Sequence, residues 1–140
     1  MTYAGKFEDQ IKKFNKMYDL KEPADPKARL ANFLDIFQEE VEEWKDIDAK
    51  LDQGDDSWKV DMADWLCDMI VYCASEAERH KIPIGKTLNI IMDSNFSKLD
   101  EQGNPIYDKR NKIIKGPNYK KPEPTIAKML ETGEYDGELI

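Results

Sequence analysis

Apolar residues recur along this chain at spacings of three and four, which is the period of an α-helix with one buried face. The pattern predicts four main helices, each bounded by proline, glycine or a residue that can cap a helix. They run from about Ala4 to Tyr18, from Pro26 to Leu51, from Asp56 or Ser57 to Arg79, and from Ile84 to Leu99. The predicted fold class is therefore all-α, with a four-helix bundle as its core.

The helical period is lost after Leu99. Gly103-Asn104-Pro105 and the stretch Ile106–Pro117 predict turns and a short hairpin. A small terminal helix is expected over Glu123–Glu131. The last residues, Gly133–Ile140, are expected to be loosely held, as chain ends often are.

Composition narrows the class of protein. A chain of 140 residues, 40% of them hydrophobic, fits one domain over 1–140, with a core at about 4–100 and a loop and tail at 101–140. The net charge of −8 argues against a nucleic acid or an anionic membrane as partner. The chain shows neither a run of about 20 apolar residues nor a signal-peptide core, and its two cysteines sit in one helix, too far apart to bridge. We therefore expect a cytoplasmic protein with reduced thiols.

The second predicted helix carries an acidic run that does not lie wholly on its polar face. A helical wheel places Glu40 inside the apolar sector and Glu43 at its edge, whereas Glu42 points to solvent. Glu39 lies on the outer side of Glu43 and is able to join it. A buried carboxylate needs neutralisation, a basic partner or a metal, because leaving it unpaired costs several kcal/mol.

The third predicted helix is apolar in nearly every direction except for one acidic stripe. Asp61, Asp64 and Asp68 fall within about 60° of one another, with no lysine interleaved. Such a helix is expected to be central in the fold. The stripe is either the helix's one window to solvent or a place where a positive group binds.

The fourth predicted helix has a polar residue in its apolar line. Asn95 occupies the middle of that line and Lys98 lies one turn along on its flank, so both are able to face inward. Taken alone, a buried amide is more often structural, and a flanking lysine more often reaches to water.

The ligand types favour a hard cation. The lone histidine, His80, is expected to be an exposed helix-end residue, and the sequence has no Glu-x-x-His pairs of the di-iron type. Carboxylates without paired histidines or cysteines suit Mg²⁺ or Mn²⁺ rather than zinc. Because Mg²⁺ commonly bridges to substrate phosphates, a phosphate ester or anhydride is the expected substrate. Walker A, dinucleotide-binding and G-x-S-x-G motifs are absent.

These motifs, taken in order, resemble the MazG-like, all-alpha nucleoside triphosphate pyrophosphohydrolases, which include dimeric dUTPases and phosphoribosyl-ATP pyrophosphohydrolase. The family pattern is Glu-Glu-x-x-Glu on one helix and Glu/Asp-x-x-Asp on the next. The matching segments are Glu39-Glu40-Val41-Glu42-Glu43, Asp61-Met62-Ala63-Asp64, Ser94-Asn95-Phe96-Ser97-Lys98, Gly103-Asn104-Pro105-Ile106 and Lys115-Gly116-Pro117-Asn118-Tyr119. Asp61 stands where the family usually has Glu, and this shorter side chain leaves Asp68 able to contribute.

The resemblance implies Mg²⁺-dependent hydrolysis of a nucleoside triphosphate to a monophosphate and pyrophosphate. It implies Glu40 as the base and, as substrate ligands, Asn95, Lys98, Lys115 and Tyr119. The implied metal ligands are Glu39, Glu40, Glu43, Asp61 and Asp64, with Mn²⁺ as a possible substitute. It further implies a homodimer or homotetramer, and the C-terminal loop is similar to that of members acting on the purine deoxynucleotides dGTP or dATP.

Two other functions remain open at this point. One is a non-enzymatic acidic adaptor, a helical bundle that binds calcium, magnesium or a basic partner. The other is phosphoribosyl-ATP hydrolysis. An adaptor would display Glu40, Asp61 and Asp64 on an open surface, whereas the enzyme needs them close to a shared metal.

Overall fold

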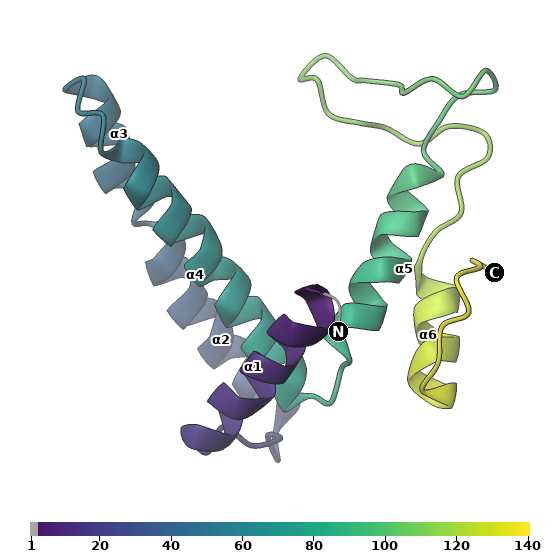
Figure 1. Ribbon diagram of the computed structural model, residues 1–140, viewed down its shortest axis with the longest axis horizontal. Coiled ribbons are helices and arrows are strands. Elements are labelled where there is room, and N and C mark those ends of the chain that lie inside the picture. The colour runs from purple at the N-terminus through teal and green to yellow at the C-terminus, as the bar shows by residue number, and fades with distance from the viewer. Residues whose placement is uncertain (1–2) are drawn as a thin grey trace. The chain divides into compact units, whose positions relative to one another are not determined.

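The computed structural model describes residues 3–140, whose regular secondary structure is helical (Figure 1). The helices are α1 (Tyr3–Met17), α2 (Pro26–Val41), α3 (Trp44–Asp52), α4 (Trp58–Arg79), α5 (Ile84–Phe96) and α6 (Glu123–Thr132). The all-α prediction is confirmed. The chain divides into two compact units, one ending at Lys81 and the other running from Ile82 to Ile140. Within residues 3–140, none of the helices combines the length and apolar character that a membrane span requires.

Helix α4 is the centre of the first unit, as its nearly continuous apolar surface predicts. It packs against α1, α2 and α3 (Figure 1). A buried polar pair joins it to α1: Nδ2 of Asn15 donates to the backbone O of Ser75 at 2.9 Å, and Oγ of Ser75 donates to Oδ1 of Asn15 at 2.6 Å. Both residues are buried beside Ile11 and Ala74. Since each polar group has a partner, this pair fixes the register of α1 on α4 without an unpaired group in the core.

The predicted helix from Pro26 to Leu51 is wrong in one respect, because it is two helices with a break at Glu42 and Glu43. At the break, the N–H of Glu43 donates to the backbone O of Glu40, in a tighter i to i+3 turn. The indole Nε1 of Trp65 also donates to that oxygen, at 2.9 Å. A side chain that enters the hydrogen-bond ladder in this way interrupts a helix.

The second unit pairs α5 with α6 (Figure 1). Ile90 and Met129 are fully buried between them, together with Ser94 and Thr125. Helix α5 ends at Phe96 rather than Leu99, because the N–H groups that follow switch to i to i+3 bonds. The predicted hairpin is reduced to two isolated antiparallel bridges, Leu99 with Pro105 and Tyr107 with Ile113.

The prediction of a loosely held C-terminal tail is wrong. The hydroxyl of Tyr135 donates to Oδ2 of Asp93 at 2.6 Å, and the N–H of Ile140 donates to Oγ1 of Thr125 at 2.9 Å. Burial and the neighbouring Asp93 carboxylate raise the pKa of Tyr135 to about 12, so its proton stays available for this bond. The tail is therefore tied to both helices of the second unit.

Candidate functional site

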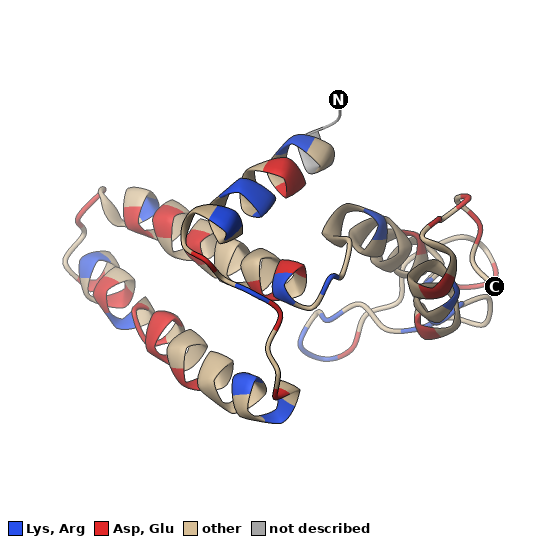
Figure 2. Ribbon diagram, turned by 90° about the horizontal axis from the view of Figure 1, so that it is seen from below, with Lys and Arg blue, Asp and Glu red and all other residues tan. Residues whose placement is uncertain are grey.

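The acidic cluster of the first unit lies where α2 gives way to α3 against the first half of α4. We define it as Glu40, Glu43, Asp64 and Asp68. Figure 2 shows acidic positions on α3 and on the facing stretch of α4. A hollow of about 250 Å³ lies beside the cluster, and Glu43, Asp46, Ile47, Asp61, Asp64 and Trp65 line it. The stripe predicted on α4 thus faces the acidic run predicted on α2.

Glu40 has the unusual environment within this cluster. Its Oε1 is buried and makes no hydrogen bond within residues 3–140. The pKa of Glu40 is raised above its ordinary value of 4.5. The largest cause is burial, followed by the charge and side chain of Glu43 and then by the charges of Asp68 and Asp64. An unpaired buried carboxylate oxygen costs free energy unless a cation or a proton compensates it. The expectation that Glu40 faces inward is confirmed.

Asp61 has a protein cation as its partner. Nζ of Lys50, in the last turn of α3, lies 2.6 Å from Oδ2 of Asp61 and 3.0 Å from Oγ of Ser57. The hydrogen bond to Asp61 raises the pKa of Lys50. Lys50 is therefore the positive group expected beside the aspartate stripe, at the Asp61 end of the stripe. A helical wheel of α4 could not predict it, because Lys50 lies on another helix.

Glu39 is exposed on α2 and lies on the outer side of the cluster. It contributes to the field felt by Tyr72, whose pKa is raised by burial and by the carboxylates of Glu40, Asp68, Glu43 and Glu39. Tyr72 follows Asp68 by one turn on α4. Its phenol therefore stays protonated at neutral pH and is a hydrogen-bond donor beside the carboxylates.

The donor set suits a hard divalent cation in its chemistry. The side chains of the acidic cluster offer only carboxylate oxygens, the ligand type that such a cation prefers. The buried Oε1 of Glu40 accepts no hydrogen bond from the described residues. In the described part of the chain, no three His, Cys, Asp or Glu side chains are gathered closely enough to hold a metal ion. Glu43 and Asp64 of the cluster, together with Asp61, line the hollow, and the carboxylates do not converge on one point.

Three of the four residues predicted to bind substrate come together in the second unit. Nζ of Lys115 lies 4.9 Å from the centre of the Tyr119 ring, and Nζ of Lys98 lies 5.9 Å from it. These are cation–π distances. We call Lys98, Lys115 and Tyr119 the lysine–tyrosine cluster. Asn95, on α5, is exposed within this unit, and its role as a substrate contact stays a prediction.

Two features hold the lysine–tyrosine cluster in place. Oγ of Ser97 donates to the backbone O of Ser94 and accepts from the N–H of Lys120, which ties the loop to the end of α5. Gly116 approaches the backbone of Leu99 so closely that a Cβ there would overlap the carbonyl group. Glycine is therefore needed at 116 for close approach of two backbones.

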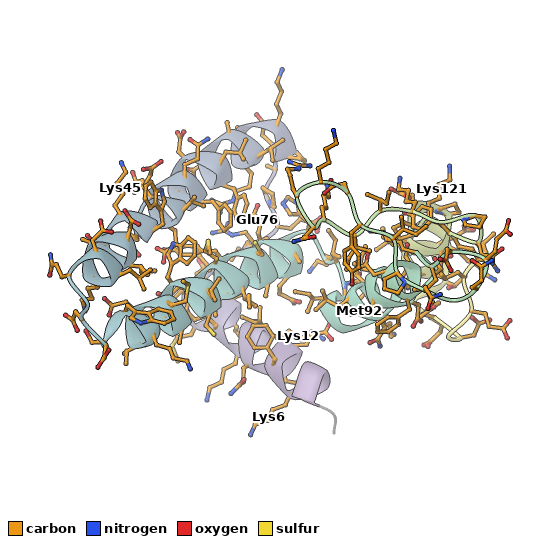
Figure 3. All side chains as sticks on the ribbon, turned by 90° about the horizontal axis from the view of Figure 1, so that it is seen from above. Lys6, Lys12, Lys45, Glu76, Met92 and Lys121 are labelled. Atoms are coloured by element: carbon orange, nitrogen blue, oxygen red, sulfur yellow. The ribbon has the colours of Figure 1, made fainter. Side chains whose placement is uncertain are left out.

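An ion-pair network at the far end of α4 was not predicted. Nε and Nη2 of Arg29 donate to the carboxylate of Glu76 at 2.7–3.1 Å, and Nε2 of His80 lies 3.0 Å from Oε2 of Glu76. His80 is thus half-buried and paired, which corrects the expectation of an exposed helix end. Figure 3 shows Glu76 on the side of α4 that faces α2. Burial alone would raise the pKa of Glu76, but hydrogen bonds from Arg29 and His80 lower it overall.

Comparison with known proteins gives little further information. No family model and no curated protein matches the chain. One solved structure that is similar is that of a candidate NTP pyrophosphohydrolase from Exiguobacterium sp. 255-15, with 18% sequence identity and a TM-score of 0.47. The match covers 90% of this chain and 95% of that one. At this identity and TM-score, the similarity assigns neither a family nor an activity.

Proposed function

We propose that this protein is a Mg²⁺-dependent nucleoside triphosphate pyrophosphohydrolase, which converts a (d)NTP and water into a (d)NMP and pyrophosphate. The observation that carries the proposal is the buried, unpartnered Oε1 of Glu40 among three further carboxylates. Repulsion and burial make this arrangement costly for a purely structural site. A carboxylate with a raised pKa, among other carboxylates that line a hollow, is typical of sites that act on a bound cation or substrate.

The residues proposed to hold the cation are Glu39, Glu40, Glu43, Asp61 and Asp64, and Mn²⁺ is the expected substitute for Mg²⁺. Asp68 joins them as a candidate, because its charge acts on Glu40 as those of Glu43 and Asp64 do. When bound, the cation would neutralise phosphate oxygens and lower the pKa of a water molecule.

Glu40 is the proposed general base. Its raised pKa brings it closer to neutral pH than an ordinary glutamate, which favours proton acceptance from water. In hydrolysis, the oxygen of water forms a new bond to one of the two phosphorus atoms, α or β, and the bond from that phosphorus to the bridging oxygen breaks. The water proton passes to Glu40, and the nucleotide leaves as a monophosphate and pyrophosphate. The surrounding carboxylates repel hydroxide and free anions, so the site requires its cation before a polyphosphate can approach.

The lysine–tyrosine cluster and Asn95 are the proposed contacts for the substrate's phosphates or base. Lys98 and Lys115 supply two ammonium groups on one ring, and the other face of Tyr119 is able to stack on a base. Purine deoxynucleotides, dGTP or dATP, are the proposed preference, on the resemblance of this loop. A homodimer or homotetramer is the proposed assembly, and phosphoribosyl-ATP is the alternative substrate.

The acidic adaptor is the weaker alternative. An adaptor would present Glu40, Asp61 and Asp64 on an open surface. Asp64 is exposed, but Glu40 and Asp61 are half-buried, and one oxygen of Glu40 is buried. The Lys50–Asp61 ion pair is the observation in the adaptor's favour, because it compensates one aspartate without a metal.

The test is incubation of the purified full chain with Mg²⁺ and a panel of dNTPs, rNTPs and phosphoribosyl-ATP, with products separated by anion exchange. We expect monophosphate and pyrophosphate in equal amounts, and none after chelation of the metal. Release of single phosphate would indicate a different phosphohydrolase. No turnover of any nucleotide by the folded, metal-binding protein would contradict the proposal and favour the adaptor.

A further inference from the structure

A cavity of about 440 Å³ lies between α1, α2 and α4 of the first unit. Small-molecule sites commonly have volumes of about 300–1,000 Å³, with apolar walls and a few polar groups at fixed positions. This cavity has that character. Its apolar walls are Phe14, Phe33, Ile36 and Val71. Arg29, Glu76 and Arg79 stand at one end, and Asp68 at the other.

The cavity and the acidic cluster share one stripe of α4. Asp68, Tyr72 and Glu76 all line the cavity and follow one another by single turns of the helix. Asp68 also belongs to the acidic cluster, since its charge acts on Glu40. From Asp68 to Glu76 the helix rises by about 12 Å. A ligand that fills the cavity therefore has one end beside the carboxylates.

The charged end of the cavity presents guanidinium donors in a fixed position. Two nitrogens of Arg29 donate hydrogen bonds to the carboxylate of Glu76, at 2.7–3.1 Å, and hold the guanidinium group in place. Nε of Arg79 lies 4.0 Å from the same carboxylate, and its Nη1 is 3.4 Å from the backbone O of Lys21. All three side chains are mostly buried, with 13–18% of their surface exposed. Nη1 of Arg29 and Nη2 of Arg79 make no hydrogen bond among the described residues, so each guanidinium keeps a donor for a planar group that carries acceptors.

We propose that this cavity binds the purine base of the nucleotide, with guanine ahead of adenine. The aromatic and aliphatic walls suit a flat heterocycle, which stacks and loses little on leaving water. Guanine offers two neighbouring acceptors, O6 and N7, which is the pair that arginine recognises best, whereas adenine replaces one acceptor with a donor. The inference rests on the proposed function, because it places the base on the stripe that leads to the acidic cluster. It assigns the base to this cavity and not to Tyr119, and leaves the phosphates to the lysine–tyrosine cluster.

Charge balance favours a base over a phosphate at this end. Glu76 offsets one of the two arginines at this end, and Asp68 adds a negative charge about 12 Å away at the other end of the cavity. A polyphosphate would meet little net positive charge here and would lie against carboxylates. A neutral base meets donors without that repulsion.

The first test uses binding alone. Methyl NMR signals of the full chain are followed while 2′-deoxyguanosine or inorganic pyrophosphate is added. We expect deoxyguanosine to shift the signals of Ile36 and Val71, which line the cavity, and to leave that of Ile90 in the second unit unmoved. Cavity signals that stay fixed at saturating deoxyguanosine, or that respond to pyrophosphate instead, would overturn the proposal.

The second test uses Arg79→Gln, with Lys59→Gln as a matched control at an exposed position on the same helix. We expect Arg79→Gln to lower kcat/KM for dGTP about tenfold and to change that for dTTP less than twofold, because a pyrimidine lacks the O6/N7 edge. Equal losses for both substrates would overturn the base assignment. If no triphosphate is hydrolysed but deoxyguanosine still binds in the cavity, the pyrophosphohydrolase proposal fails and the base site stands.

Discussion

Trp65 of α4 donates a hydrogen bond from its indole Nε1 to the backbone O of Glu40, at 2.9 Å. This bond fixes the place where α2 ends. It also sets the Glu40 side chain against Asp64 and Asp68, because Trp65 follows Asp64 directly on α4. The helix break and the candidate base are thus consequences of the same contact.

Replacing Trp65 with phenylalanine should therefore affect both stability and activity. Loss of one hydrogen bond to a half-buried carbonyl is expected to lower the free energy of unfolding by about 1 kcal/mol. The activity of the folded protein should also fall, because Glu40 loses its fixed position. Urea unfolding and steady-state kinetics measure the two effects. Trp58→Phe, at the start of α4, is the control, and equal loss of activity in both variants would argue against a role for this bond.

Lys50 is expected to compete with a divalent cation for Asp61. The ion pair is about one-third exposed on both sides, so Lys50→Gln should leave the free energy of unfolding almost unchanged. Its removal frees a carboxylate, and the affinity for Mn²⁺, measured by electron paramagnetic resonance, should rise several-fold. Lys45→Gln, which removes an exposed lysine paired with Glu42, is the control. An unchanged or lower affinity for Mn²⁺ in Lys50→Gln would show that Asp61 is no ligand.

The Arg29–Glu76 pair should make the stability of the first unit depend on pH. The pKa of Glu76 is lowered in the folded state, so its contribution is present above the unfolded value of about 4.5 and is lost as the pH falls through the folded value. Glu76→Gln is expected to cost about 1.5 kcal/mol at pH 7. The difference from the wild type should shrink below pH 4.5, where the wild type also loses the charge. Urea unfolding at pH 7 and pH 3.5 checks this, with Glu78→Gln as control, and a difference independent of pH would contradict it.

Gly116 should be required for the position of Lys115. A Cβ at 116 would overlap the backbone O of Leu99, so Gly116→Ala must move the loop away from the end of α5. We expect KM for the triphosphate to rise several-fold with a smaller change in kcat, because Lys115 and Tyr119 separate from Lys98. Lys109→Ala, in an exposed part of the same loop, should leave KM unchanged. If Gly116→Ala also leaves KM unchanged, the lysine–tyrosine cluster does not contact substrate.

The helices were predictable because each has a one-sided apolar pattern that depends only on neighbours along the chain. The same wheel placed Glu40 inward and put Asp61, Asp64 and Asp68 on one stripe, and the structure confirms the inward Glu40. The apolar periodicity of the sequence does not predict which side chains of different helices contact each other. The break at Glu42 depends on Trp65, 22 residues or more away in sequence, and α2 has no proline or glycine there to announce it.

The missed polar contacts have the same origin. The pairings Lys50 with Asp61 and Arg29 with Glu76 join different helices, at separations of 11 and 47 residues. The anchored tail depends on Tyr135 reaching Asp93. Asn95 lies in the apolar line of α5, and that line is only partly covered within the second unit, where Asn95 itself is exposed.

The central claim is that Glu40 is the base of a pyrophosphohydrolase, and Glu40→Gln tests it most directly. The substitution keeps the shape of the side chain and removes its charge. Glu42→Gln is the matched control, because Glu42 is two residues away, exposed and paired with Lys45, and Asp64→Asn tests the cluster separately. With Mg²⁺ and dGTP, we predict that kcat falls at least 100-fold in Glu40→Gln and is unchanged in Glu42→Gln, with both variants folded. Equal formation of dGMP and pyrophosphate by wild type and Glu40→Gln would contradict the account.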